Sequence, residues 1–212
     1  MTRLQVALDF LTVEDAAALA ARLGADVDLL EAGTPLIKRF GMAAVTALRD
    51  ACPATPIVAD LKTVDAGAWE ADLALDAGAQ VVTVLGCADD ATIAAMANAA
   101  HARGGQVFVD LINVADKAAR AAQVAALGAD AVCVHAGADH QAGGHDAVSE
   151  LDALGGTLAC KLVVAGGIHP ANLAQVLAHH PDVVIVGRSV TAASDPAAVV
   201  ASLRRVLNAA GR

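Results

Sequence analysis

The sequence predicts a single (β/α)8 barrel over residues 1–212, with eight parallel strands inside and helices outside. Short runs rich in Val, Ile and Leu recur about every 26 residues, which is typical of strands buried on both faces of a parallel sheet. Ala-rich segments with apolar residues at helical spacing separate these runs. Repeated alternation of strand and helix favours a parallel sheet, and eight units are the number that closes a barrel.

The expected strands are apolar and five to seven residues long, as buried strands usually are. The first expected strand is preceded by only three residues, and the last one begins some thirty residues before the end of the chain. The eight ranges in chain order are 4–9, 27–31, 57–62, 80–85, 106–112, 131–135, 161–165 and 182–186.

Helical segments follow the strands in register, most clearly at 16–23 and 91–97. Thr12 with Asp15 three residues later resembles a capping box at the start of the first helix. Three glycines precede an Ala and a polar residue that leads into the next strand, and this weak repeat predicts left-handed helix caps. These glycines are Gly24, Gly78 and Gly128.

An open, doubly wound sheet would also satisfy the alternation of strand and helix. Its dinucleotide-binding version is disfavoured, because no Gly-x-Gly-x-x-Gly follows the first expected strand. No linker, low-complexity tract or domain boundary interrupts the pattern, so one domain is expected.

The composition excludes several classes of protein. Hydrophobic residues make up 57% of the chain and charged residues 17%, which excludes disorder through high charge. The net charge is -9, and there are three Phe, one Trp and no Tyr. A nucleic-acid binder needs a basic surface and aromatic stacking platforms, so no nucleic-acid partner is expected. The expected partner is a small molecule.

The N-terminus and the cysteines favour a cytoplasmic protein. The chain runs from Met1 almost directly into the first apolar run, without the long apolar stretch of a secretory signal. Mean hydropathy is +0.56. No apolar run approaches the roughly twenty residues of a membrane-spanning helix, so no membrane segment is expected. The scattered cysteines favour reduced core thiols over a zinc site or disulfides. They are Cys52, Cys87, Cys133 and Cys160.

Ionisable residues stand at or near the carboxyl ends of five expected strands, where catalytic residues of such barrels gather. One charged strand end is often only a helix cap, but five together are hard to explain as caps. We therefore expect these residues to face one mouth of the barrel. They are Asp9, Glu31, Asp60 with Lys62, Asp110 and His135.

The spacing of these residues suggests roles. Asp60 and Lys62 lie two residues apart in an expected strand and share a face, as a catalytic pair or as a structural ion pair. Glu31 and Asp60 end neighbouring strands and could hold Mg²⁺, with water and substrate as its other ligands. The ordinary pKa of His135, about 6.5, suits proton transfer. Asp65 could cap the next helix or reach across a subunit interface.

Glycines follow the last two expected strands, where backbone N–H groups of such barrels bind phosphate. Arg188 could add a charge-assisted contact to the same group. Glycines also serve ordinary turns, but their occurrence in both loops favours a sugar-phosphate ligand. The candidate phosphate-binding residues are Gly166, Gly167, Gly187 and Arg188.

Five segments resemble the orotidine 5'-monophosphate decarboxylase superfamily, over nearly the whole chain. Asp60-x-Lys62-x-x-Asp65 is specific for the superfamily. The Glu31 and His135 segments are similar to its branch of 3-hexulose-6-phosphate synthases and 3-keto-L-gulonate-6-phosphate decarboxylases. The segments are Leu4-Gln5-Val6-Ala7-Leu8-Asp9, Glu31-x-Gly33-Thr34-Pro35, Ala59-Asp60-Leu61-Lys62-x-x-Asp65-Ala66, Val82-Thr83-Val84-Leu85-Gly86 and His135-Ala136-Gly137-x-Asp139-x-Gln141-Ala142.

Within that branch, the strand containing Asp110 and the Ala136-Gly137 pair resemble the synthases. Gly187-Arg188-Ser189 is instead similar to the decarboxylases. The resemblance to the synthases implies a lyase of the ribulose monophosphate pathway. Such an enzyme condenses formaldehyde with D-ribulose 5-phosphate to D-arabino-hex-3-ulose 6-phosphate, and 6-phospho-3-hexuloisomerase could be its pathway partner.

The resemblance also implies a role for each candidate residue. Mg²⁺ or Mn²⁺ would bind Glu31 and Asp60, His135 would remove a C1 proton, and Lys62 would stabilise the resulting enediolate. The implied protein is a homodimer with active sites at its interface. Asp9 would hold a substrate hydroxyl, Asp65 would enter the partner subunit's site, and Gly166, Gly167, Gly187 and Arg188 would bind the phosphate.

Four other functions stay open or are disfavoured by the residues. The decarboxylase forms the same kind of enediolate by losing CO₂ and then protonates it. Orotidine decarboxylation is disfavoured by the Glu31 segment, and a ribulose-phosphate epimerase would need metal-binding His residues at strand ends. A sugar-phosphate sensor without catalysis would not need the complete set of Asp60, Lys62, Asp65 and His135.

Overall fold

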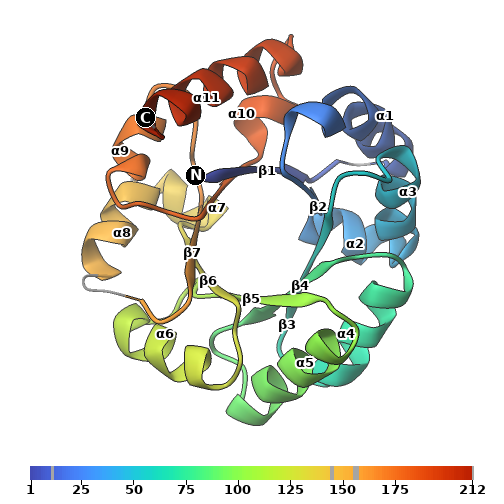
Figure 1. Cartoon of the computed structure of the whole chain (residues 1–212), viewed down its shortest axis with the longest axis vertical. Coiled ribbons are helices and arrows are strands. Elements are labelled where there is room, and N and C mark those ends of the chain that lie inside the picture. The colour runs from blue at the N-terminus through green and yellow to red at the C-terminus, as the bar shows by residue number, and fades with distance from the viewer. Residues whose placement is uncertain (11, 144–145, 155–157, 212) are drawn as a thin grey trace.

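The computed structural model describes residues 1–10, 12–143, 146–154 and 158–211. Its eight strands are parallel and form a closed barrel in chain order, with β1 paired to both β2 and β8. Helices surround this barrel on all sides (Figure 1). The predicted (β/α)8 fold is confirmed, and the open sheet is excluded. The strands are β1 Arg3–Leu8, β2 Leu29–Ala32, β3 Ile57–Thr63, β4 Val81–Leu85, β5 Gln106–Asp110, β6 Ala131–His135, β7 Lys161–Ala165 and β8 Val183–Val186.

One or two helices follow each strand in the described part of the chain. Thr12 caps the first of them, because its hydroxyl accepts a hydrogen bond from the Asp15 backbone N–H, as the sequence predicts. The helices are α1 Val13–Leu23, α2 Thr34–Phe40, α3 Ala43–Ala51, α4 Gly67–Asp76, α5 Asp90–Ala102, α6 Lys117–Ala126, α7 Ala138–Ala142, α8 Ala147–Leu154, α9 Leu173–Leu177, α10 Arg188–Thr191 and α11 Pro196–Ala210, with a 3-10 turn η1 at Gly24–Asp26.

The glycine caps are confirmed at two of three positions. Gly78 and Gly128 have φ values of +104° and +101°, which favour glycine. The expectation for Gly24 is wrong, because its φ is -54° and the chain continues into η1. Glycine stands there for a different reason, since a Cβ atom would lie 2.6 Å from the Cys52 sulfur.

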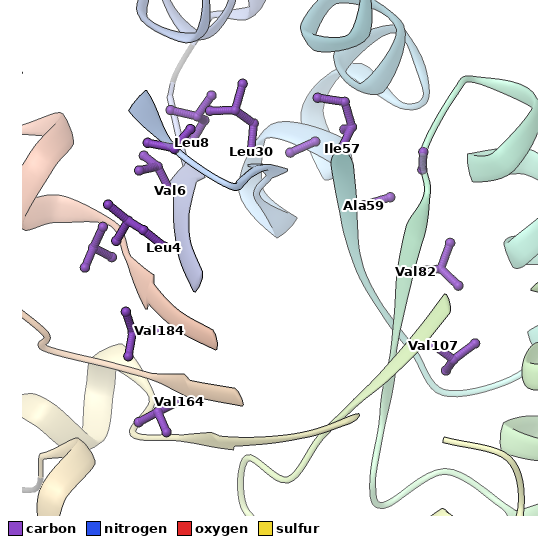
Figure 2. Packing of buried hydrophobic residues seen from close by; sticks show 14 of the residues in the cluster. Leu4, Val6, Leu8, Leu30, Ile57, Ala59, Val82, Val107, Val164 and Val184 are labelled. Atoms are coloured by element: carbon purple, nitrogen blue, oxygen red, sulfur yellow. The ribbon is translucent and has the colours of Figure 1, made fainter. Parts of the chain in front are cut away.

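Side chains alternate between the two faces of every strand. Figure 2 shows Leu8, Leu30, Val82 and Val107 pointing from their strands toward the helices, where they join the larger hydrophobic core. Their neighbours in sequence point into the barrel, where Phe108 belongs to a second cluster of buried apolar side chains. This alternation assigns the polar residues near the carboxyl ends of the strands to the barrel interior.

At the opposite, amino-terminal rim of the barrel, four polar side chains accept hydrogen bonds from backbone N–H groups of neighbouring strands. Asp28 accepts a hydrogen bond from the Leu4 backbone N–H, at the start of β1, at 2.7 Å. Equivalent contacts join Gln80 to Ile57, Asp130 to Val107 and Asp182 to Leu162, at 2.6, 2.8 and 2.9 Å. Each residue precedes an even-numbered strand and binds the first part of the odd-numbered strand before it. We call these four residues the rim clamps.

The expectation of four reduced core thiols is confirmed in part. Cys52 and Cys133 are buried, whereas Cys160 is half-buried and Cys87 is exposed. All four are free thiols. Among the helices in the described ranges, none combines the length and apolar character needed to cross a membrane.

Candidate active site

The carboxyl ends of β3, β5 and β6 bring four ionisable side chains together in the barrel mouth. Lys62 Nζ lies 2.7 Å from Asp60 Oδ2 and 3.1 Å from Asp110 Oδ2. His135 Nδ1 lies 2.9 Å from the same Asp110 oxygen. Asp110 therefore bridges the ammonium and the imidazole, and the sequence-predicted convergence of Asp60 and Lys62 is observed.

Lys62 remains a cation. Burial alone would lower its pKa, but the charges of Asp60 and Asp110 outweigh burial and raise the pKa above its ordinary value. Its side chain is only 24% exposed. An ammonium fixed in this way cannot act as a base, and it presents a permanent positive charge to a bound anion.

Asp110 remains a carboxylate for the complementary reason. Burial would raise its pKa, but the hydrogen bond with His135 and the charges of His135 and Lys62 hold it below the ordinary value. An ionised carboxylate only accepts hydrogen bonds, so His135 Nδ1 carries the proton that joins them. In the neutral imidazole, Nε2 is then the nitrogen that can accept a proton.

Asp60 is held on both of its oxygens. Thr34 Oγ1 donates to Oδ2 at 2.5 Å, and Thr83 Oγ1 donates to Oδ1 at 2.8 Å. Lys62 Nζ donates to both oxygens, at 2.7 and 3.0 Å. The carboxylate therefore has a fixed orientation in the mouth of the barrel.

Glu31 is buried at the end of β2, where the Gln5 side-chain amide donates a hydrogen bond to it. The other polar atom of that amide, Gln5 Oε1, is buried without a partner among the described residues. Burial and the negative charge of Asp60 raise the pKa of Glu31 to about 8. A divalent cation beside Glu31 and Asp60 would relieve this repulsion and favour the ionised form.

The described residues include no group of three His, Cys, Asp or Glu side chains arranged to hold a metal. The carboxylate oxygens of Glu31 and Asp60 are hard donors, which fit a cation that keeps several waters and takes further oxygen ligands from a substrate, as Mg²⁺ does. This donor set does not resemble a closed structural zinc site.

Asp9 follows β1 immediately and packs against Gly33. A Cβ atom on Gly33 would lie 1.9 Å from Asp9 Oδ1, so only glycine leaves room for this carboxylate. Partial removal from water and the charge of Asp60 raise the Asp9 pKa. Asp9 Oδ2 is also 3.9 Å from the position of a Cβ atom on Gly187, which places Asp9 beside the loop after β8.

The two glycine loops lie on this same mouth. Gly166 and Gly167 follow β7 with φ values of +104° and +67°. A Cβ atom on Gly166 would lie 2.3 Å from the Ala136 carbonyl oxygen, so the loop packs closely on the end of β6. Gly187 precedes α10, and the Arg188 side chain is exposed. The structure thus brings both loops to the barrel mouth, beside Asp9 and the end of β6.

Asp65 does not join the cluster of Asp60, Lys62, Asp110 and His135 in the barrel mouth. It lies exposed in the loop after β3, and its Oδ1 accepts a hydrogen bond from the Ala66 backbone N–H at 2.7 Å. Three large hydrophobic side chains close to it in sequence are also exposed, with Trp69 at 72%. The other two are Val64 at 58% and Leu73 at 49%.

The structure adds contacts and residues to the site that the sequence did not predict. Asp110 was expected only as a polar strand end, yet it contacts both Lys62 and His135. Thr34, Thr83 and Gln5 hold the two candidate metal ligands. The alternation of inward and outward residues could have identified Thr83 and Gln5, because both occupy inward positions.

Comparisons with known proteins identify the family of this chain. Residues 2–203 match the Orotidine 5'-phosphate decarboxylase / HUMPS family. A 3-hexulose-6-phosphate synthase of Mycobacterium gastri is 44% identical over 205 residues, 97% of this chain and 99% of that protein. The solved structure of the synthase from Salmonella typhimurium is 38% identical with a TM-score of 0.92, covering 99% of this chain and all of that one.

A solved structure of 3-keto-L-gulonate-6-phosphate decarboxylase from Vibrio cholerae is also similar. It is 30% identical, has a TM-score of 0.85 and covers 98% of both chains. The resemblance to the synthases is confirmed by relatives that match almost end to end, and so is the expectation of a lyase. The chain belongs to the Orotidine 5'-phosphate decarboxylase / HUMPS family.

Proposed function

We propose that the protein condenses formaldehyde with D-ribulose 5-phosphate to give D-arabino-hex-3-ulose 6-phosphate. The observation that carries this proposal is the contact of Asp110 with both Lys62 and His135. This contact places a proton-accepting imidazole beside a permanent cation, which is what a reaction through an enediolate needs. The 44% sequence identity to a 3-hexulose-6-phosphate synthase, over 97% of this chain, supports the same reaction.

In the proposed first step, Nε2 of His135 takes the proton from C1 of the sugar phosphate. The C1–H electron pair moves toward the C2 carbonyl, so negative charge develops on oxygen. The Lys62 ammonium stabilises this charge, and Asp110 stabilises the imidazolium that forms. C1 then attacks the carbon of formaldehyde while the C2 carbonyl forms again, and the aldehyde oxygen takes the proton that the His135 imidazolium holds.

Glu31 and Asp60 would hold Mg²⁺, or Mn²⁺ in its place. When bound, the ion would polarise the carbonyl oxygen and the neighbouring hydroxyl oxygen of the substrate. The chain contributes the orientation of its two carboxylates, through Gln5 on Glu31 and through Thr34 and Thr83 on Asp60.

The phosphate would bind between the loops after β7 and β8. Gly166, Gly167 and Gly187 would offer their backbone N–H groups there without side chains in the way. Arg188 has no ion-pair partner within the described ranges and would supply a charge-assisted contact. Asp9, beside Gly187, would then receive a hydroxyl of the same substrate.

The protein would act as a homodimer in which Asp65 reaches the partner subunit's site. The exposed side chains of Val64, Trp69 and Leu73 support this arrangement, because an apolar surface of this kind favours association. A Trp69→Glu variant that stays monomeric yet keeps full activity would contradict the role of Asp65 across the interface.

A second candidate is decarboxylation of 3-keto-L-gulonate 6-phosphate, which Arg188 and the Vibrio cholerae relative favour. Both substrates should be assayed side by side with Mg²⁺, following formaldehyde consumption in one reaction and CO₂ release in the other. We expect formaldehyde to be consumed only when D-ribulose 5-phosphate is present. Rapid CO₂ release without formaldehyde consumption would replace the proposal by the second candidate.

A further inference from the structure

The backbone of β3 is distorted where it carries the catalytic cluster. Ala59 pairs with Val82 of β4, and the next paired residue of β3, Thr63, lies opposite Val84. Residues 60–62 of β3 therefore face one residue of β4, Thr83. This is a bulge in a parallel pair of strands, and such distortions often redirect a side chain near an active site.

Lys62 has a φ of +48° inside this bulge. The left-handed conformation is unfavourable for a residue with a side chain, and it persists only where surrounding contacts fix it. The Lys62 side chain nevertheless reaches Asp60 and Asp110 at once. The unusual backbone and the position of the ammonium thus belong to one arrangement.

Thr83 makes two contacts with the bulge through a single hydroxyl. Its Oγ1 accepts a hydrogen bond from the Lys62 backbone N–H at 3.0 Å and donates one to Asp60 Oδ1 at 2.8 Å. The direction of both bonds is fixed, because a backbone N–H can only donate and a hydroxyl has one proton. Thr83 is 8% exposed, so water competes little for either bond.

We propose that Thr83 is a positioning residue whose hydroxyl holds the β3 bulge, and through it the Lys62 ammonium and the Asp60 carboxylate. The Thr34 hydroxyl contacts the carboxylate and the backbone carbonyl oxygen of Asp60, whereas the Thr83 hydroxyl also contacts the Lys62 backbone, so the two threonines have different roles. The inference rests on the proposed function, because that function assigns Lys62 and Asp60 their chemistry.

The test compares two substitutions at Thr83. Thr83→Val keeps the shape and removes the hydroxyl, whereas Thr83→Ser keeps the hydroxyl. For Thr83→Val we expect kcat to fall about 10- to 100-fold with little change in KM, because misplacement of about 1 Å has effects of this size. Hydrogen exchange of the Lys62 amide should also become faster. Thr83→Ser should restore both properties.

Thr55→Val is the matched control. The Thr55 hydroxyl donates to the Gly24 carbonyl oxygen at 2.8 Å, away from the cluster. This variant should lose stability without a loss of kcat. If Thr83→Val does not fold, Thr83→Ala takes its place, since it removes the same hydroxyl without putting an apolar methyl group beside Asp60.

Two results would overturn the inference. One is an unchanged kcat and unchanged Lys62 amide protection when the hydroxyl is absent. The other is a Thr83→Ser variant as impaired as Thr83→Val, which would mean that the hydroxyl does not by itself hold the bulge. Failure of the wild-type protein in both substrate assays would reject the proposed function, while amide exchange would still test the role of Thr83 in the bulge.

Discussion

Replacing Asp110 by Asn should impair proton abstraction more than it impairs folding. Asp110 Oδ2 lies 3.1 Å from Lys62 Nζ and 2.9 Å from His135 Nδ1, and Asn would remove the charge from both contacts. A hydrogen bond to a charged group contributes about 1.5–3 kcal/mol. The two contacts share one oxygen and are not additive, so we count one of them and expect kcat to fall about 10- to 150-fold.

The informative assay follows exchange of the C1 proton of D-ribulose 5-phosphate in D₂O by NMR, without formaldehyde. It measures the step assigned to His135 independently of carbon–carbon bond formation. Asp130→Asn is the matched control, because Asp130 Oδ2 lies 2.8 Å from His101 Nε2 at the opposite rim of the barrel. Wild-type exchange rates in Asp110→Asn would refute the assignment of Asp110 and His135.

Three further predictions concern the pH response, the substrate and the rim. Because the Glu31 pKa is raised to about 8, the metal-free protein should lose stability as the pH rises from about 4.5 through 8. In Glu31→Gln, the melting temperature measured by thermal unfolding should depend less on pH over this range. Gly33→Ala should displace Asp9 and raise KM for D-ribulose 5-phosphate about tenfold in steady-state kinetics, with the melting temperature nearly unchanged. Asp182→Ala should lower the free energy of unfolding by about 1 kcal/mol in urea titrations while kcat stays the same.

The barrel was predictable because its two periodicities are visible along the chain. Strands buried on both faces require continuous Val, Ile and Leu, and the segments between them keep helical spacing. The predicted ends of several strands differ from the observed ends by one or two residues. The range 106–112 was expected as a strand, but β5 ends at Asp110, whose side chain accepts a hydrogen bond from the Ile112 backbone N–H.

The candidate site was predictable in composition but not in connectivity. Polar strand ends identify Asp60, Lys62 and His135 as neighbours. Sequence alone cannot show that one Asp110 oxygen contacts both Lys62 and His135, because this depends on side-chain rotamers and on the stagger of strands. Simple alternation could not predict the bulge at Lys62 either. It treats the strand as regular, so it predicts that Lys62 shares a face with Asp60 but does not predict the left-handed backbone that accompanies this placement.

The rim clamps divide the chain into four units of two strands each. Asp28, Gln80, Asp130 and Asp182 recur at nearly equal intervals, and every clamp joins strands that are consecutive in sequence. Met1 and Gly211 lie close together, since a Cβ atom on Gly211 would be 3.4 Å from the Met1 side chain. A circular permutant with joined termini and new ends near Gly104, between the second and third units, would therefore keep every clamp within one continuous segment.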